Sequence, residues 1–212
     1  MDLHLHAPQY PMRGCGMDLP LLDWLNAYAF PTEARFSDPD YARELYRALA
    51  RELIESGTTR VCMFSSLHRE ATLILMEELE RAGVTGYVGK VNMDRNGGKN
   101  LQETTEESRR ETLLWLEACQ DFRHIRPILT PRFIPSCTDG LMDFLGKLAA
   151  ERSLPVQSHL SENTGEIQWV KELHPDCSQY WECYAKYGLW NRRTAMAHCV
   201  WSDERERRAM AE

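Results

Sequence analysis

Short apolar, β-branched runs alternate along the chain with segments whose apolar positions recur at helical spacing. The runs predict strands, and the segments between them predict helices. Residues 58–65 (TTRVCMFS) form a short β-branched and apolar run, whereas apolar positions in residues 42–54 recur at helical spacing. Asp38 and Pro39 supply a cap and a first-turn proline for that helix, and Gly57 ends it. Local pattern alone therefore predicts one strand and one helix here.

The same alternation continues to the end of the sequence. Strands are predicted at residues 2–5, 58–65, 87–93, 125–130, 155–160 and 194–200. Further helices are predicted at residues 69–82, 105–121, 138–152, 166–173 and 179–187, with the start of another at 202–212. Strands that alternate with helices favour a parallel α/β sheet. Since no linker or low-complexity segment divides the chain, residues 1–212 are expected to form one domain with no second domain.

Two parallel architectures compete, an open doubly wound sheet and a (β/α)8 barrel. No glycine-rich phosphate turn follows any predicted strand, which disfavours the dinucleotide-binding form of the open sheet. Polar residues instead follow many of the strands, as they do at the catalytic face of a barrel. About six strand–helix units are visible where a closed barrel needs eight. We therefore expect an incomplete TIM-like (β/α)8 barrel.

Composition argues against some classes of binding partner and indicates a cellular location. The chain is 43% hydrophobic and 27% charged, with a net charge of −7, which argues against a nucleic-acid backbone as partner. No apolar run approaches the roughly 20 residues of a membrane span, and no signal peptide is apparent. The seven cysteines are scattered without CxxC spacing, which is typical of reduced thiols. A cytoplasmic protein is expected.

Histidines at strand ends are the strongest chemical signal. His4 and His6 would share one face of a strand, because side-chain direction alternates with period two, and paired imidazoles can bind a metal. Alternatively, they are a chance pair in a loop. His159 and His198 each end a predicted strand, where a lone histidine is more often structural. Together the four suffice for a mononuclear metal centre.

The other histidines carry weaker signals. His68 follows a strand but lies beside a helix start, so a helix-capping or supporting role is at least as plausible as a site role. His124 and His174 lie beside charged or turn residues and are interpreted as surface residues.

Motifs spread over the whole chain resemble those of the guanine deaminase family, zinc enzymes of the amidohydrolase superfamily. They are HLHAPQY, DLPLLDWL, YVGKVNMDRN, LTPRFIPSC, PVQSHLSEN and MAHCV. The resemblance implies a metal-dependent hydrolase barrel, with a small β-rich domain built from both chain ends in the family. It also implies a homodimer and a reaction of purine metabolism, the hydrolytic deamination of guanine to xanthine and ammonia.

The resemblance assigns roles to particular positions. It implies zinc ligands at His4, His6, His159 and His198. It implies catalytic roles for Glu162, as a proton carrier, and for His198. It implies purine contacts at Gln9, Trp24, Leu25, Arg132, Phe133 and His159.

The chemistry of the side chains agrees with these roles. A carboxyl near a metal can carry protons between water, ring nitrogen and leaving amine. Arg132 offers a fork of donors suited to a carbonyl oxygen such as O6 of guanine, and Phe133 offers an apolar face for a flat base. The alternatives are a helix-start carboxylate for Glu162 and a surface salt bridge for Arg132.

The chain also departs from the family pattern. The family has an aspartate ligand at the end of its eighth strand, which no residue here matches, and Asp203 is a poor substitute by position. We expect an internal fragment that lacks part of the β-rich domain and the last barrel strands, and that is inactive alone. Two alternatives stay open: a non-catalytic remnant that binds metal or purine, and a related amidohydrolase for another heterocycle. LTPRF and the glutamine after HLHAP favour guanine.

Overall fold

The computed structural model describes residues 1–98 and 100–211. Its strands are β1 (Asp2–His6), β2 (Arg60–Phe64), β3 (Thr85–Gly89), β4 (Val91–Asn92), β5 (Ile125–Pro127), β6 (Thr130–Pro131), β7 (Val156–Leu160) and β8 (Thr194–His198). Each pairs in parallel with its neighbour, in the orders β1-β2-β3-β5, β4-β6 and β7-β8. A parallel bridge from Leu129 to Val156 continues the sequence of strands to β7. Spatial order thus follows chain order, as expected for a partial barrel.

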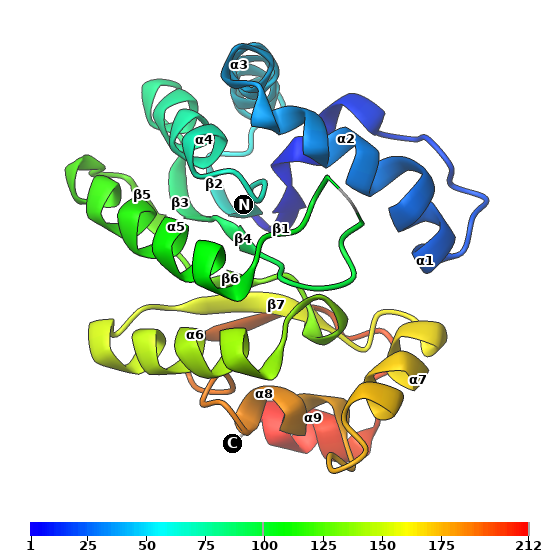
Figure 1. Ribbon diagram of the computed structural model, residues 1–212. Helices are drawn as coiled ribbons and strands as arrows, with labels where there is room; N and C mark the ends of the chain where they lie inside the picture. Colours follow the sequence, from blue (N-terminus) through cyan, green and yellow to red (C-terminus); the bar gives the residue numbers. More distant parts are fainter. Residues whose placement is uncertain (99, 212) are drawn as a thin grey trace.

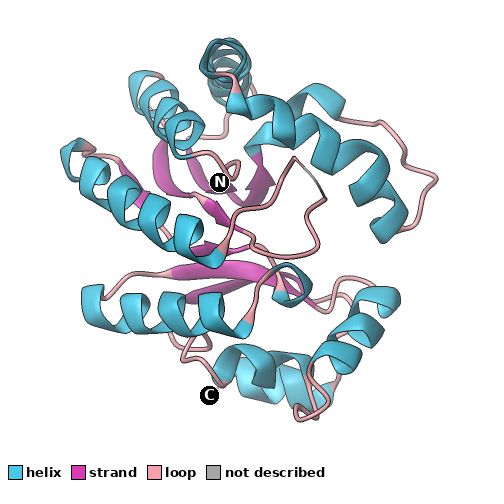
Figure 2. Cartoon of the chain, in the orientation of Figure 1, coloured by secondary structure: helices cyan, strands magenta, loops and turns pink. Residues whose placement is uncertain are grey.

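Helices lie outside the strands (Figures 1 and 2). The α-helices are α1 (Leu21–Trp24), α2 (Phe30–Ala34), α3 (Pro39–Glu55), α4 (Arg69–Arg81), α5 (Thr105–Ala118), α6 (Asp139–Arg152), α7 (Thr164–Leu173), α8 (Tyr180–Ala185) and α9 (Glu204–Ala211). Shorter helical turns are η1 (Ala7–Met12), η2 (Leu25–Ala29), η3 (Arg35–Ser37), η4 (Cys119–Asp121) and η5 (Ile134–Ser136). No helix in the described ranges is long and apolar enough to cross a membrane.

Local sequence explains where the long helices begin and end. The Asp38 carboxylate accepts from the backbone N–H groups of Asp40 and Tyr41, which caps α3 as predicted. Gly57 after α3 and Gly83 after α4 adopt positive φ angles of 81° and 80°, the left-handed conformation that glycine tolerates. The predicted boundaries of these helices are therefore close to those observed.

Two predicted strands are each split. Residues 87–93 form the end of β3 and the whole of β4, and residues 125–130 form β5 and the start of β6. Pro127 and Pro131 lack the N–H that a continuous ladder needs. Gly89 lies so close to the next strand that an added Cβ would meet the Thr130 hydroxyl at 1.7 Å.

The segment between β1 and α3 is helical, which the sequence pattern did not predict. It combines η1, α1, the π-helical turn η2, α2 and η3. Prolines interrupt the apolar periodicity, and Pro31 is the second residue of α2, which follows the π turn. This segment packs over the end of the sheet that carries the strand-end histidines, so it forms one wall of the site.

The buried side chains form two clusters. The larger lies between the strands and α3–α8 and includes Met63, Leu75 and Trp115, all fully buried. The smaller cluster joins Phe30 and Leu25 to Phe64, Met93 and Phe133. It fastens the η1–α2 segment to the strand ends, and thereby positions the candidate site.

Candidate active site

Four histidines converge at the carboxyl ends of the strands. The ring centroid of His4 lies 5.1 Å from His6, 4.9 Å from His159 and 4.8 Å from His198. The Nε2 atoms of His6 and His159 are 2.9 Å apart. Three strands supply these rings, with two from β1, one from β7 and one from β8. The convergence expected from the sequence is observed.

Backbone geometry turns the last of these rings toward the others. His198, the last residue of β8, and Cys199 after it have positive φ angles of 69° and 53°, a left-handed conformation unusual for residues with a side chain. The His198 ring then stacks 5.3 Å from His159 and lies 3.4 Å, Nε2 to Oε2, from the Glu162 carboxylate. The local strain is consistent with a functional position.

The histidine cluster has the chemistry of a metal site. Burial, and then the nearby His198 imidazole, lowers the pKa of His4 to about 4, and burial also lowers the pKa of His198. Burial also holds the pKa values of His6 and His159 well below the usual 6.5, so these rings are neutral at neutral pH. Neutral imidazole is the form that binds a metal.

Hydrogen bonding points in the same direction. The Nδ1 of His159 lies 2.5 Å from the Arg132 carbonyl oxygen, which can only accept, so Nδ1–H donates and the lone pair is on Nε2. His6 Nδ1 is buried with no hydrogen-bond partner in the described part of the chain. One nitrogen each from His4, His6 and His159 lie within 4.8 Å of one another, as do ligand atoms of His159, Glu162 and His198. The residues present fit a zinc ion.

Glu162 is held beside the histidines by the start of α7. Burial, and then the nearby Glu166 carboxylate, raises the pKa of Glu162 to about 7. Glu166 is fully buried and accepts from the backbone N–H groups of Glu162 and Asn163, at 2.9 and 3.2 Å, and from the Tyr180 hydroxyl at 2.6 Å. A carboxyl that titrates near neutral pH can both give and take a proton.

A cavity of about 280 Å³ opens in front of this cluster. Its walls contain every residue that the sequence assigned to the site, with Leu5 and Leu21 in addition: His4, Leu5, His6, Gln9, Leu21, Trp24, Leu25, Arg132, Phe133, His159, Glu162 and His198. Leu21 belongs to the helical segment that the sequence pattern did not predict, which is why it was missed.

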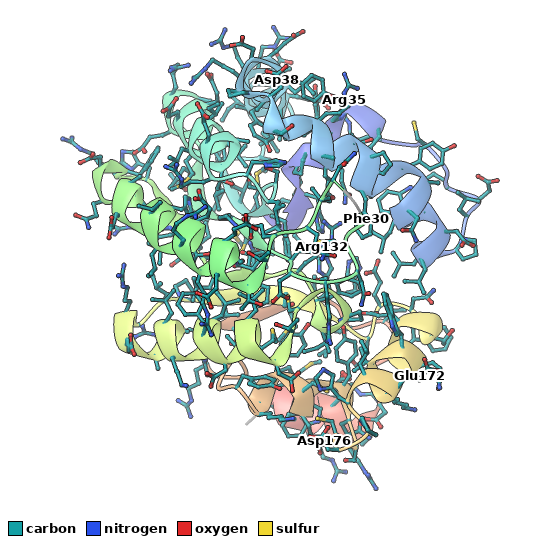
Figure 3. All side chains as sticks on the ribbon, viewed as in Figure 1. Phe30, Arg35, Asp38, Arg132, Glu172 and Asp176 are labelled. Atoms are coloured by element: carbon teal, nitrogen blue, oxygen red, sulfur yellow. The ribbon has the colours of Figure 1, made fainter. Side chains whose placement is uncertain are left out.

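Two of the lining residues, Gln9 and Arg132, donate to a carboxylate behind them that sequence reasoning also missed. Glu33 of α2 accepts from Nη1 and Nη2 of Arg132, at 2.5 and 3.0 Å, and from Nε2 of Gln9 at 2.9 Å. The side chains of Arg132 and Glu33 are 3% and 1% exposed, so the surface salt bridge considered for Arg132 is instead a buried one. The Arg132 fork is directed at Glu33, and Figure 3 shows Arg132 beside Phe30 near the centre of the molecule.

The other candidate residues lie elsewhere. The Asp203 carboxylate accepts from the Glu206 N–H at the start of α9 and does not line the cavity. His68 is the N-cap residue of α4 and does not line the cavity. Its side chain makes no capping hydrogen bond, so of the two roles considered beside a site role the capping one is wrong. His124 is exposed as predicted, but His174 is only 4% exposed, because it packs at the end of α7 near Arg95 and Asp139.

Comparison with known proteins shows which family the chain belongs to. The amidohydrolase family model matches residues 1–212. The chain belongs to this family. The guanine deaminase of Rattus norvegicus is 43% identical over 215 residues, which is 100% of this chain and 47% of that protein. This amidohydrolase chain thus spans about half the length of the curated relatives it matches.

Solved structures agree with the fold. A guanine deaminase from C. acetobutylicum with bound guanine in the active site superposes with a TM-score of 0.96 at 47% identity, over 99% of this chain and 51% of that one. An adenosine deaminase from Xanthomonas campestris with bound zinc superposes with a TM-score of 0.84 at 22% identity, over 99% and 46%. At that identity the second match supports the fold alone. The predicted incomplete barrel and the resemblance to guanine deaminases are confirmed.

Proposed function

We propose that the protein carrying this chain hydrolyses guanine to xanthine and ammonia, with zinc held by His4, His6, His159 and His198. The observation that carries the proposal is a single cavity whose lining combines imidazoles of lowered pKa and Glu162 with Arg132, Gln9 and Phe133. The similarity to guanine deaminases, one of them with bound guanine, supports the choice of substrate.

The reaction requires proton transfers that Glu162 can perform. Water adds its oxygen to C2 of the base, a ring nitrogen gains a proton, and the bond from C2 to the exocyclic nitrogen breaks to release ammonia. When bound, zinc supplies the positive charge that makes water nucleophilic near neutral pH. Glu162 lies within 3.4 Å of His198 and carries a pKa of about 7, so its carboxyl can pass one proton of the water to the ring nitrogen. It can then pass the second proton, from the hydroxyl formed at C2, to the leaving nitrogen as the carbonyl forms.

The rest of the cavity would bind and orient the base. Phe133 is 5% exposed and offers an apolar wall, with Trp169 packed edge-to-face against it at 6.3 Å. Arg132 supplies donors and Gln9 an amide that can donate or accept. A planar heterocycle with a carbonyl oxygen is complementary to this wall.

An assay of the full-length, zinc-loaded protein tests the proposal. Guanine should disappear with matching formation of xanthine and ammonia, and a chelator should abolish turnover until zinc is restored. Absence of xanthine formation, with turnover of another aminated heterocycle such as cytosine or a triazine, would favour the alternative deaminase. Absence of any turnover, with metal or purine binding retained, would favour a non-catalytic protein.

Variants separate proton transfer from metal binding. Glu162→Gln should reduce turnover by about 10²–10⁴-fold while guanine still binds, because a proton carrier is lost. His4→Ala should lower zinc content, whereas His124→Ala, at an exposed histidine outside the cavity, should not. Near-normal turnover by Glu162→Gln would show that another group carries the protons.

Residues 1–212 expressed alone test a further proposal. We propose that this chain holds zinc through its histidines but turns over guanine poorly, since catalysis tolerates little misplacement of the reacting groups. Xanthine formation at the rate of the full-length protein would contradict this. Homodimerisation and a cytoplasmic location stay predictions from the sequence.

A further inference from the structure

Glu33 is a buried carboxylate with no direct place in the cavity wall. It is 1% exposed, and both of its oxygens are occupied by side chains that do line the cavity. Oε1 accepts from Gln9 and from Arg132, so these two groups meet at a single atom. Since burial of a charge is costly unless it is fully paired, this arrangement holds both partners firmly.

The bond to Glu33 determines which end of the Gln9 amide is free. A carboxylate can only accept, so Nε2 of Gln9 must face it, and the reversed amide would bring two oxygens into contact. Within residues 1–98 and 100–211, no group donates to Gln9 Oε1. The cavity wall therefore presents a hydrogen-bond acceptor at Gln9.

The Arg132 guanidinium is held along one edge by Glu33 and on one face by Phe30. Its Nη1 and Nη2 atoms donate to the two oxygens of Glu33, and the Phe30 ring centroid lies 5.0 Å from its Cζ. The guanidinium has no acceptor, so it can present only donors to the cavity. Because Gln9 and Arg132 share Glu33 Oε1, the acceptor and the donor lie side by side.

We propose that Glu33 is a positioning residue that sets this acceptor–donor pattern and thereby selects heterocycles with an N–H beside a carbonyl, the lactam edge. The inference rests on the proposed function for its substrate, since guanine carries such an edge at N1 and C6. It concerns recognition alone, and can be tested with ligands that do not react.

The test measures binding of hypoxanthine, which has the lactam edge, and of unsubstituted purine, which lacks it, to the full-length zinc-loaded protein. The unaltered protein should prefer hypoxanthine. Glu33→Gln should reduce that preference about 10- to 100-fold, because the new amide can donate to Gln9 and no longer pairs with the charge of Arg132. With guanine, KM should rise by a similar factor, with kcat and zinc content much less affected.

Two further variants keep the inference falsifiable. Glu52→Gln neutralises a carboxylate that accepts from both Nη atoms of Arg13, outside the active-site cavity, and should leave the preference unchanged. If Glu33→Gln fails to fold, Gln9→Met removes the acceptor while the Arg132–Glu33 pair remains, and should also reduce the preference. An unchanged preference in Gln9→Met would overturn the proposal.

Failure of this inference is distinguishable from failure of the proposed function. Guanine turnover with KM and ligand preference unaltered in a folded Glu33→Gln protein would overturn the inference and leave the function intact. A Glu33-dependent preference for hypoxanthine in a protein that does not deaminate guanine would support the inference and reject the function.

Discussion

Two arginine–glutamate clusters in this molecule share almost the same contacts and differ in burial. In each, a glutamate accepts from both Nη atoms of an arginine and from a third donor, and the members are Arg132, Glu33 and Gln9 in the buried cluster and Arg13, Glu52 and Tyr10 in the exposed cluster. Each arginine also lies over an aromatic ring. The arginine and glutamate side chains are 3% and 1% exposed in the first cluster, and 61% and 42% exposed in the second.

This comparison shows that hydrogen-bond geometry alone does not reveal what a cluster does. Gln9 and Tyr10 are neighbours in η1, yet one side chain supports the cavity wall and the other lies outside the active-site cavity. An exposed pair is screened by water and contributes little to stability. A buried pair is sensitive to the loss of either partner, because an uncompensated charge would remain in the interior.

The largest expected effect is on stability in the buried cluster. Arg132→Ala should lower the free energy of unfolding by about 3–5 kcal/mol, because Glu33 stays buried without its cation. Urea denaturation of the zinc-loaded protein measures this, with Arg13→Ala as the matched control. Similar losses in both variants would show that burial does not distinguish the clusters.

Replacing both buried charges should separate stability from recognition. The double variant Arg132→Met with Glu33→Met should recover stability to within about 1 kcal/mol of the original protein, because apolar side chains of similar size can replace a buried ion pair. Guanine binding should nevertheless be lost, because Arg132 no longer supplies its donors to the cavity. Urea denaturation measures the stability, and calorimetric titration measures guanine binding. Guanine binding as tight as in the original protein would contradict a role for these residues in recognition.

Salt should weaken the coupling in the exposed cluster and leave that in the buried cluster nearly unchanged. The screening length falls from about 10 Å at 0.1 M salt to about 3 Å at 1 M, but acts mainly on exposed charges. Double-mutant cycles for Arg13 with Glu52 and for Arg132 with Glu33, each at both salt concentrations, measure the coupling. Equal salt dependence in the two cycles would be inconsistent with the burial difference.

The smallest expected effect is the pH dependence of the stabilisation that the exposed cluster contributes. Hydrogen bonds from Arg13, and then from Tyr10, lower the pKa of Glu52 below 4.5. Because the folded-state pKa is the lower one, the stabilisation is complete above the unfolded-state value and is lost as pH falls through the folded-state value. A carboxyl-detected NMR titration should report the low pKa, and Arg13→Met should raise it toward 4.5.

Much of the framework was predictable because its signals are local. The cap at Asp38, the glycines after α3 and α4 and the apolar spacing within α3 each act over a few residues. The prediction was wrong where local pattern was interrupted. Prolines interrupt the apolar spacing in the segment before α3, so its helices were not predicted. Pro127 and Pro131 lie where strands predicted as continuous are divided.

The candidate site likewise has a part that local signals predict and a part that they do not. Period-two alternation puts His4 and His6 on one face, and strand ends carry His159 and His198, so sequence alone determined that imidazoles would gather at one end of a parallel sheet. Glu33 carries no such signal, since it lies 99 residues from Arg132 along the chain and belongs to an unpredicted helix. Only the tertiary structure decided that this carboxylate would be buried between two cavity residues, because burial and pairing over such a separation depend on how the segments pack.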